Sequence, residues 1–275
     1  MTKKEAFILF GVAVALLILA IPFDLTFSSL VYDQSNLIGR VGEAIGEFPA
    51  TVVAMFSSAA LIFTRNTKKP LSNFGSLILG GLFLGLSALM GGILPFHYLE
   101  ISLIPGFVLA VVYIVLAILV VKRIPNSQYP ALRKVAWVGL LTFIVAMIAV
   151  NMIKMGWGRM RFRAMEESTA GFTPWYLPQG SASGEEFKSF PSGHVANSAL
   201  ILWILLIPTF YPLWDKYKSV LKIVAYAWIV FVALSRIIMG AHFISDVTVG
   251  FAVTAVILWG LIMAFKVETS VSKNR

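Results

Sequence analysis

Long runs of apolar residues alternate with short polar stretches along almost the whole chain. Each run holds about 20 residues, the length that an α-helix needs to cross the hydrocarbon core of a bilayer. The runs lie at residues 6–23, 48–64, 73–94, 101–121, 135–153, 191–211, 219–237 and 246–265. The pattern therefore predicts an all-α polytopic membrane bundle of about eight transmembrane helices, of which 48–64 is the shortest.

The composition agrees with a chain that lies mostly in lipid. Hydrophobic residues make up 59% of the 275 positions and charged residues 13%, about half the charged fraction of an average soluble domain. The chain has no cysteine, which excludes disulfides and cysteine-based metal sites. The net charge of +9 would also suit a nucleic-acid partner, but the placement of the basic residues favours orientation in a membrane, so we expect no nucleic acid.

The first apolar run, 6–23, follows Lys3 and Lys4 and allows two interpretations. It is long for the apolar core of a signal peptide, and no clear small-x-small cleavage site follows it. We therefore interpret it as a retained helix.

Basic residues gather in alternate loops. If the N-terminus is inside, the cytoplasmic segments hold most of the 22 lysines and arginines, including the pairs Lys68–Lys69, Lys122–Arg123 and Arg133–Lys134. The outer segments hold more acidic than basic residues. The positive-inside rule thus favours eight helices with both termini cytoplasmic.

The chain divides into three predicted parts: N-terminal helices in 1–133, a core that carries the chemistry in 134–266, and a cytoplasmic tail in 267–275. Within the first part, apolar residues recur at helical spacing near 35–48, with Ser35 or Asn36 as a candidate cap. We expect an amphipathic helix on the outer interface. The alternative is a loop with scattered apolar residues.

Three short segments hold the residues best suited to catalysis. They are Lys154 followed by Arg161, then Pro191-Ser192-Gly193-His194, and then Ser235-Arg236 followed by His242 and Asp246. In the predicted topology they fall in the 154–190 loop, at the start of the sixth helix and in the 238–245 turn. All three therefore lie on the outer face, where they can form one site.

The second segment has the features of an anion site. Proline suits the first turn of a helix, and serine is a capping residue. Free backbone N–H groups and the positive end of the helix dipole attract anions there. Gly193 permits a ligand to approach the backbone closely, and His194 stands beside that place.

The other two segments add cations and an orientable imidazole. Lys154, Arg161 and Arg236 supply positive charge, and arginine suits bidentate contacts with phosphate. His242 and Asp246 are four residues apart, so on a helix they share a face and the carboxylate can hold the imidazole. An oriented histidine is what a nucleophile or general base requires. The set fits phosphoryl transfer.

Other polar residues carry weaker expectations. His97 lies beside Phe96 and Tyr98 in a short outer loop, and we interpret it as an interfacial residue. The remaining cations near the motifs have two equally weighted interpretations: they contact substrate, or they lie on a solvated surface. These residues are Arg159, Arg163 and Lys188.

Together, the three segments resemble the motifs of the type 2 phosphatidic acid phosphatase superfamily, in its branch of integral membrane lipid phosphatases. The resemblance covers about 154–246, in the family's order. Phe162 departs from it, because the family usually has proline after the arginine of the first motif. Five predicted helices precede that motif where the smallest members have three, so the first two helices have no assigned role.

By position, the resemblance implies that His242 attacks phosphorus and forms a phosphohistidine, that Asp246 orients His242, and that His194 protonates the leaving oxygen. It implies phosphate contacts by Lys154, Arg161, Ser192, Gly193 and Arg236. It also implies a reaction without metal or cofactor, which agrees with a site that offers many cations and one carboxylate.

The expected function is hydrolysis of a lipid phosphate or pyrophosphate at the outer face of a membrane, most simply a bacterial plasma membrane. Candidate substrates are undecaprenyl pyrophosphate, phosphatidylglycerol phosphate and phosphatidic acid, and the aromatic part of the 154–190 loop is expected to cover the headgroup. A phosphotransferase of the same family is an open alternative. A transporter would need charges in the middle of helices, where this chain has few. Haloperoxidases with a similar site are soluble, which argues against them here.

Overall fold

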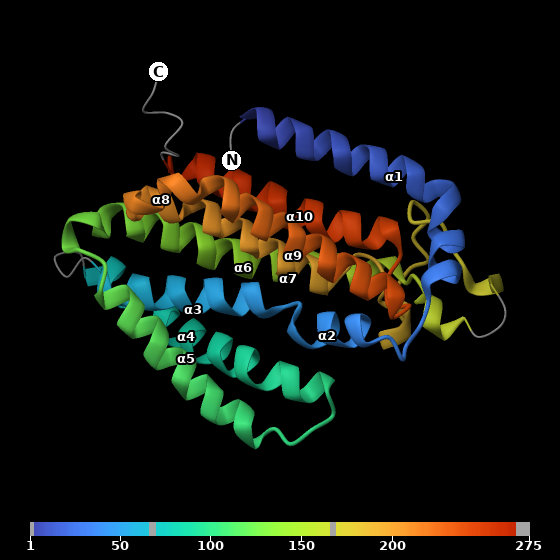
Figure 1. The fold of residues 1–275 in the computed structure, drawn as a ribbon, viewed down its shortest axis with the longest axis horizontal. Coiled ribbons are helices and arrows are strands. Elements are labelled where there is room, and N and C mark those ends of the chain that lie inside the picture. Colours follow the sequence, from blue (N-terminus) through green and yellow to red (C-terminus); the bar gives the residue numbers. More distant parts are fainter. Residues whose placement is uncertain (1–2, 66–69, 166–168, 268–275) are drawn as a thin grey trace.

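The computed structural model describes residues 3–65, 70–165 and 169–267. Lys68, Lys69 and the predicted tail beyond 267 lie outside the described residues. The α-helices are α1 (Lys3–Val31), α2 (Leu37–Ile45), α3 (Phe48–Phe63), α4 (Pro70–Tyr98), α5 (Ile104–Lys122), α6 (Tyr129–Trp157), α7 (Gly193–Ala199), α8 (Ile207–Phe210), α9 (Lys218–Ile238) and α10 (Ile244–Ala264) (Figure 1).

The predicted membrane bundle is confirmed. The described chain has 81% helix and no strand. It contains 8 helical segments that are long and apolar enough to cross a membrane, one for each predicted run. The protein is therefore an integral membrane protein, and the loop between α6 and α7 lies at one end of the bundle, where α2 and the end of α1 also lie (Figure 1).

Helix α1 is longer than its apolar run suggests, because it continues through Asp24 to Val31. It packs along α10, at the other end of the sequence. This pairing brings the end of α1 to the N-terminus of α10, close to the third motif.

The helix predicted near 35–48 is present as α2. The side chain of Asn36 accepts a hydrogen bond from Gly39 N at 3.1 Å and is thus the N-cap. A Cβ at Gly42 would lie 2.4 Å from Ser235 Oγ, so only glycine lets α2 pack this closely on α9. Leu37, on another side of α2, is 74% exposed. The helix thus places small residues toward the protein, while its predicted position on the outer interface stays a prediction.

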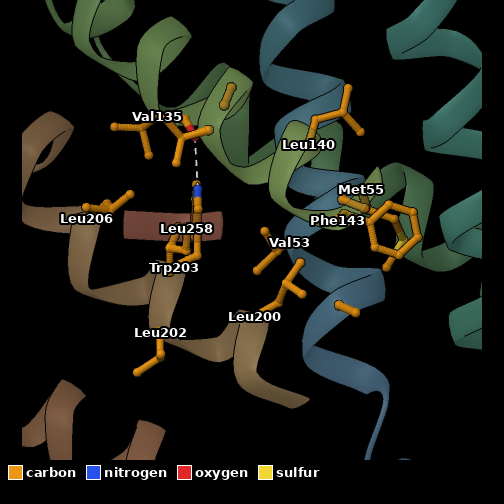
Figure 2. Close-up of a cluster of buried hydrophobic side chains, with 14 of the residues drawn as sticks. Val53, Met55, Val135, Leu140, Phe143, Leu200, Leu202, Trp203, Leu206 and Leu258 are labelled. Carbon is orange, nitrogen blue, oxygen red and sulfur yellow. Dashed lines mark hydrogen bonds between the residues drawn. The ribbon is translucent and has the colours of Figure 1, made fainter. Parts of the chain in front are cut away.

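The sixth span is not one continuous α-helix. After α7 the chain forms a 3₁₀ segment, Leu200–Leu206, and then the short helix α8, which has Pro208 in its first turn. Trp203 in the 3₁₀ segment is buried against α3 and α6, and its Nε1 donates to Val135 O at 2.9 Å (Figure 2). This apolar core fixes the span that carries the second motif.

Helix α10 packs closely on the segment that begins α7. Ser192 N donates to Asp246 O at 2.9 Å, and a Cβ at Gly250 would lie 2.3 Å from Ser192 O. Backbone atoms cannot move aside as a flexible side chain can. The second and third motifs are therefore held together by a glycine contact.

Gly250→Ala should consequently destabilise the protein by about 1–3 kcal/mol, the usual cost of overpacking, and lower its Tm in detergent. Gly260→Ala is the matched control, because Gly260 lies on the same helix and a Cβ added there would meet no atom within 4 Å. Alanine favours helix over glycine, so this control should keep or raise the Tm. Equal melting of the two variants would contradict the close contact.

Candidate active site

A cavity of about 530 Å³ lies where the motifs meet. Its lining includes most of the residues singled out in the sequence: Lys154, Arg161, Gly193, His194, Arg236 and His242. Ser192 and Asp246 are fully buried behind this lining. The structure thus brings the three segments together at one place.

Several hydrogen-bond donors in this cavity are buried without a partner. No described residue is hydrogen-bonded to Arg161 Nε, to Arg236 Nε and Nη1, or to His194 Nε2, which donates when the ring is protonated. Leaving such groups unpaired costs about 1–3 kcal/mol each, and more for charged groups. Donors of this kind, arranged around one cavity, are suited to an anion with several oxygens, such as phosphate.

Lys154 and Ser192 have different structural roles at the site. Lys154 Nζ donates to Lys188 O at 2.7 Å, which fixes the end of the loop that joins α6 to α7. Ser192 is the N-cap of α7, since its Oγ accepts from Val195 N at 3.4 Å. The Ser192 side chain therefore orders the helix start, while Gly193 lines the cavity.

The ring of His242 is held by a backbone carbonyl. Nδ1 lies 2.6 Å from Ser189 O and 3.8 Å from Asp246 Oδ2. A carbonyl oxygen only accepts, so Nδ1 carries a proton and Nε2 has a free lone pair. Burial lowers the pKa of His242 to about 3, so the ring is neutral at physiological pH. This is the form in which an imidazole acts as a nucleophile.

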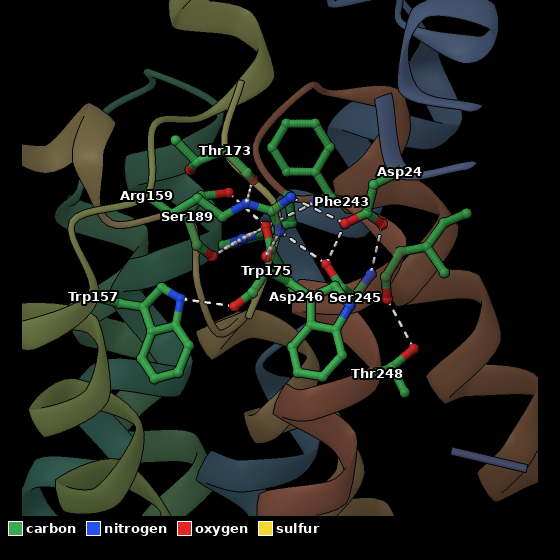
Figure 3. Close-up of polar contacts among 12 residues, drawn as sticks. Asp24, Trp157, Arg159, Thr173, Trp175, Ser189, Phe243, Ser245, Asp246 and Thr248 are labelled. Atoms are coloured by element: carbon green, nitrogen blue, oxygen red, sulfur yellow. Dashed lines mark hydrogen bonds and ion pairs between the residues drawn. The ribbon is translucent and has the colours of Figure 1, made fainter. Parts of the chain in front are cut away.

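Asp246 lies in a dense set of donors. Its carboxylate accepts from Phe243 N at 2.9 Å, from Ser189 Oγ at 2.5 Å and from Arg159 Nη1 at 2.5 Å (Figure 3). The contact with Phe243 caps α10. Asp246 and Ser189 O together fix the position of His242, whereas the sequence suggested Asp246 alone.

Arg159 is neither a substrate contact nor part of a solvated surface, the two alternatives expected from the sequence. It is 0% exposed, and it bridges Asp246 to Asp24, whose Oδ2 lies 3.0 Å from Arg159 Nη2. Asp24 Oδ1 also accepts from Ser245 N at 2.9 Å, so α1 caps the N-terminus of α10 (Figure 3). The first helix is thus bound directly to the third motif.

Acidic side chains also enter the cavity. Glu43 Oε1 lies 2.9 Å from Arg236 Nη2. Glu186 accepts from Arg163 at 3.1 and 2.7 Å, and this hydrogen bonding lowers the pKa of Glu186. No pattern in the sequence indicates Glu43, which lies in α2, far from the motifs in the chain.

The aromatic part of the 154–190 loop covers Arg159 and not the cavity. Thr173 O accepts from Arg159 Nε at 3.0 Å, and the Phe172 ring lies 5.5 Å from the guanidinium. The loop residues that line the cavity come later, at Glu185, Glu186 and Lys188. The part of the loop that borders the cavity is therefore this charged stretch, and not the aromatic residues that were expected to cover the headgroup.

A family model and a bacterial protein are similar to this chain. Residues 135–269 match the model of the PAP2 superfamily. The chain is also 29% identical, over 134 residues, to phosphatidylglycerophosphatase B of Bacillus subtilis (strain 168), and this match covers 48% of the chain and 57% of the relative. No solved structure gives a significant match. The segment 135–269, whose motifs meet with Lys154 and Arg161 at one cavity, is thus similar to the PAP2 superfamily.

Proposed function

We propose that this protein is a metal-independent membrane phosphatase that hydrolyses a lipid phosphate through a phosphohistidine on His242. The observation that carries the proposal is the set of unpartnered, buried donors of Arg161, Arg236 and His194 around the cavity that His242 lines. The match of 135–269 to the PAP2 superfamily model and the name of the Bacillus subtilis relative support it.

The proposed reaction has two displacements at phosphorus. In the first, His242 Nε2 attacks, the bond from phosphorus to the lipid oxygen breaks, and His194 gives a proton to that oxygen. In the second, water attacks the phosphohistidine while His194 takes a proton from it, and the P–N bond breaks. Arg161, Arg236 and Lys154 stabilise the negative charge on the phosphoryl oxygens in both steps.

The cavity has one apolar wall, which supports a lipid substrate. Met90 of α4 and Ala146, Met147 and Val150 of α6 form this part of the lining. A phosphate bound among the cations would place the adjoining part of its lipid along this wall. In this proposal the acyl or prenyl tail stays in the bilayer.

We further infer that the site faces the outside of a bacterial plasma membrane. The distribution of basic residues between alternate loops supports this orientation. Phosphatidylglycerol phosphate is the first candidate substrate, because the Bacillus subtilis relative bears the name of that activity. Undecaprenyl pyrophosphate and phosphatidic acid follow.

The test is phosphate release by the detergent-purified protein in the presence of EDTA. Phosphatidylglycerol phosphate, phosphatidic acid and undecaprenyl pyrophosphate are offered side by side at equal concentration. We expect release that EDTA does not reduce, fastest from phosphatidylglycerol phosphate. No release from any of the three, or release that needs added Mg²⁺, would contradict the proposal.

A further inference from the structure

The chain N-terminal to the PAP2 match contributes a carboxylate to the histidine of the second motif. Glu47 lies at the start of α3, outside residues 135–269. Its Oε1 is 3.4 Å from His194 Nδ1. The two side chains are 16% and 12% exposed, so they face each other mostly shielded from solvent.

The Glu47 carboxylate is held in place from α7. Asn197, one turn after His194 on that helix, donates from Nδ2 to Glu47 Oε1 at 3.1 Å. Asn197 also lines the cavity. Two side chains of one helix thus approach the same oxygen, which fixes the carboxylate relative to the His194 ring.

The other nitrogen of the His194 ring, Nε2, is the one available to a substrate in the cavity. His194 Nε2 is buried, and no described residue is hydrogen-bonded to it, while the residue lines the cavity. The imidazole therefore connects a carboxylate at Nδ1 with the phosphate site at Nε2. A carboxylate in this position orients a histidine and stabilises its protonated form.

Building on the proposed function, we propose that Glu47 is a positioning residue for His194, which it holds as the proton donor to the leaving oxygen. Glu47 also lines the cavity, but in this proposal it acts through the His194 ring and not on phosphorus. When the P–O bond breaks, His194 Nε2–H passes its proton to the departing oxygen and the ring becomes neutral. When water attacks the phosphohistidine, Nε2 takes a proton from the water, and the ring regains the charge that Glu47 compensates.

Glu43 provides the contrast, because it comes from the same part of the chain and its side chain contacts another group, although its backbone is hydrogen-bonded to His194. It lies 2.9 Å from Arg236 Nη2, so it compensates a phosphate-binding cation. Glu43→Gln should change KM by a similar factor for every phosphate ester. Glu47→Gln should lower kcat/KM, which reports the first displacement alone, and mainly for esters whose leaving group needs a proton.

The experiment compares two leaving groups in the wild type, Glu47→Gln and Glu43→Gln. Phosphatidic acid has an alcohol that leaves poorly without a proton, whereas p-nitrophenyl phosphate has one that leaves as an anion. Since general acid catalysis contributes about 10²–10⁴-fold, we expect Glu47→Gln to lower kcat/KM for phosphatidic acid by about 10- to 100-fold. For p-nitrophenyl phosphate the loss should be no more than about threefold.

A double variant tests whether Glu47 acts through His194. Once His194→Ala has removed the proton donor, adding Glu47→Gln should lower kcat/KM for phosphatidic acid no further. Glu47→Asp should recover part of the loss. Asn197→Ala leaves all charges in place and should reproduce the leaving-group pattern in weaker form, even if Glu47→Gln proves unstable.

Equal losses on both esters, or additive effects of Glu47→Gln and His194→Ala, would overturn the inference. Either result leaves the proposed function standing, because wild-type release from lipid decides that question separately. A wild type that releases phosphate from p-nitrophenyl phosphate alone would contradict the proposed function and not the pairing of Glu47 with His194.

Discussion

His242→Ala is expected to lower phosphate release from lipid by about 10³-fold or more, since removal of a nucleophile abolishes the covalent route. The neutral ring, held at Nδ1 by Ser189 O, presents its Nε2 lone pair to the cavity. Alanine leaves the surrounding cations in place. Substrate should therefore still bind while the chemical step fails, so kcat is expected to fall with little change in binding.

The control for this variant is His97→Ala, which removes a histidine that lines a neighbouring cavity. It should keep wild-type activity. Wild-type protein quenched in alkali during turnover of ³²P-labelled substrate should carry acid-labile label, and His242→Ala should carry none. Turnover by His242→Ala near the wild-type rate would mean that another group attacks phosphorus.

The membrane bundle could be predicted because its determinants are local. Each apolar run must satisfy its own backbone in lipid and so forms a helix, whatever lies elsewhere in the chain. The motif residues were recognisable for a similar reason. Lys154, Arg161, His194, Arg236 and His242 stand in short segments whose spacing is visible in the sequence, and the structure gathers all of them around one cavity.

The groups that support these residues were not predictable, because their partners lie far away in the chain. Asp24 and Arg159 are separated by 135 positions, and Glu47 and Asn197 by 150. Nothing near Asp24 distinguishes it from an acid at a membrane boundary. Only the packing of α1 on α10 and of α3 on α7 shows that the N-terminal helices lie against the motif residues.

Ser189 shows a second limit. The contact that orients His242 is made by the carbonyl oxygen of Ser189, and every residue has a carbonyl. Its side chain donates to Asp246 at 2.5 Å, but a serine beside the second motif gives no sign of this role in the sequence. Sequence patterns report side-chain chemistry, so a role that depends on the path of the backbone appears only in the fold.

Arg159→Met should destabilise the protein by about 3–5 kcal/mol, the cost of breaking a buried ion pair. Methionine fills much of the space but leaves Asp24 and Asp246 buried near each other without the cation between them. For a chain of this size the expected fall in Tm is on the order of 10 °C. Thermal unfolding in detergent measures it.

Arg163→Met is the matched control, because it removes another arginine of the same loop. Arg163 is 24% exposed and pairs with Glu186, which is 42% exposed, so its loss should cost no more than about 1 kcal/mol. Asp24→Asn combined with Arg159→Met removes one of the two stranded carboxylates and should recover part of the lost stability. If Arg159→Met melted like Arg163→Met, the buried bridge from α1 to α10 would not be what holds the first helix to the site.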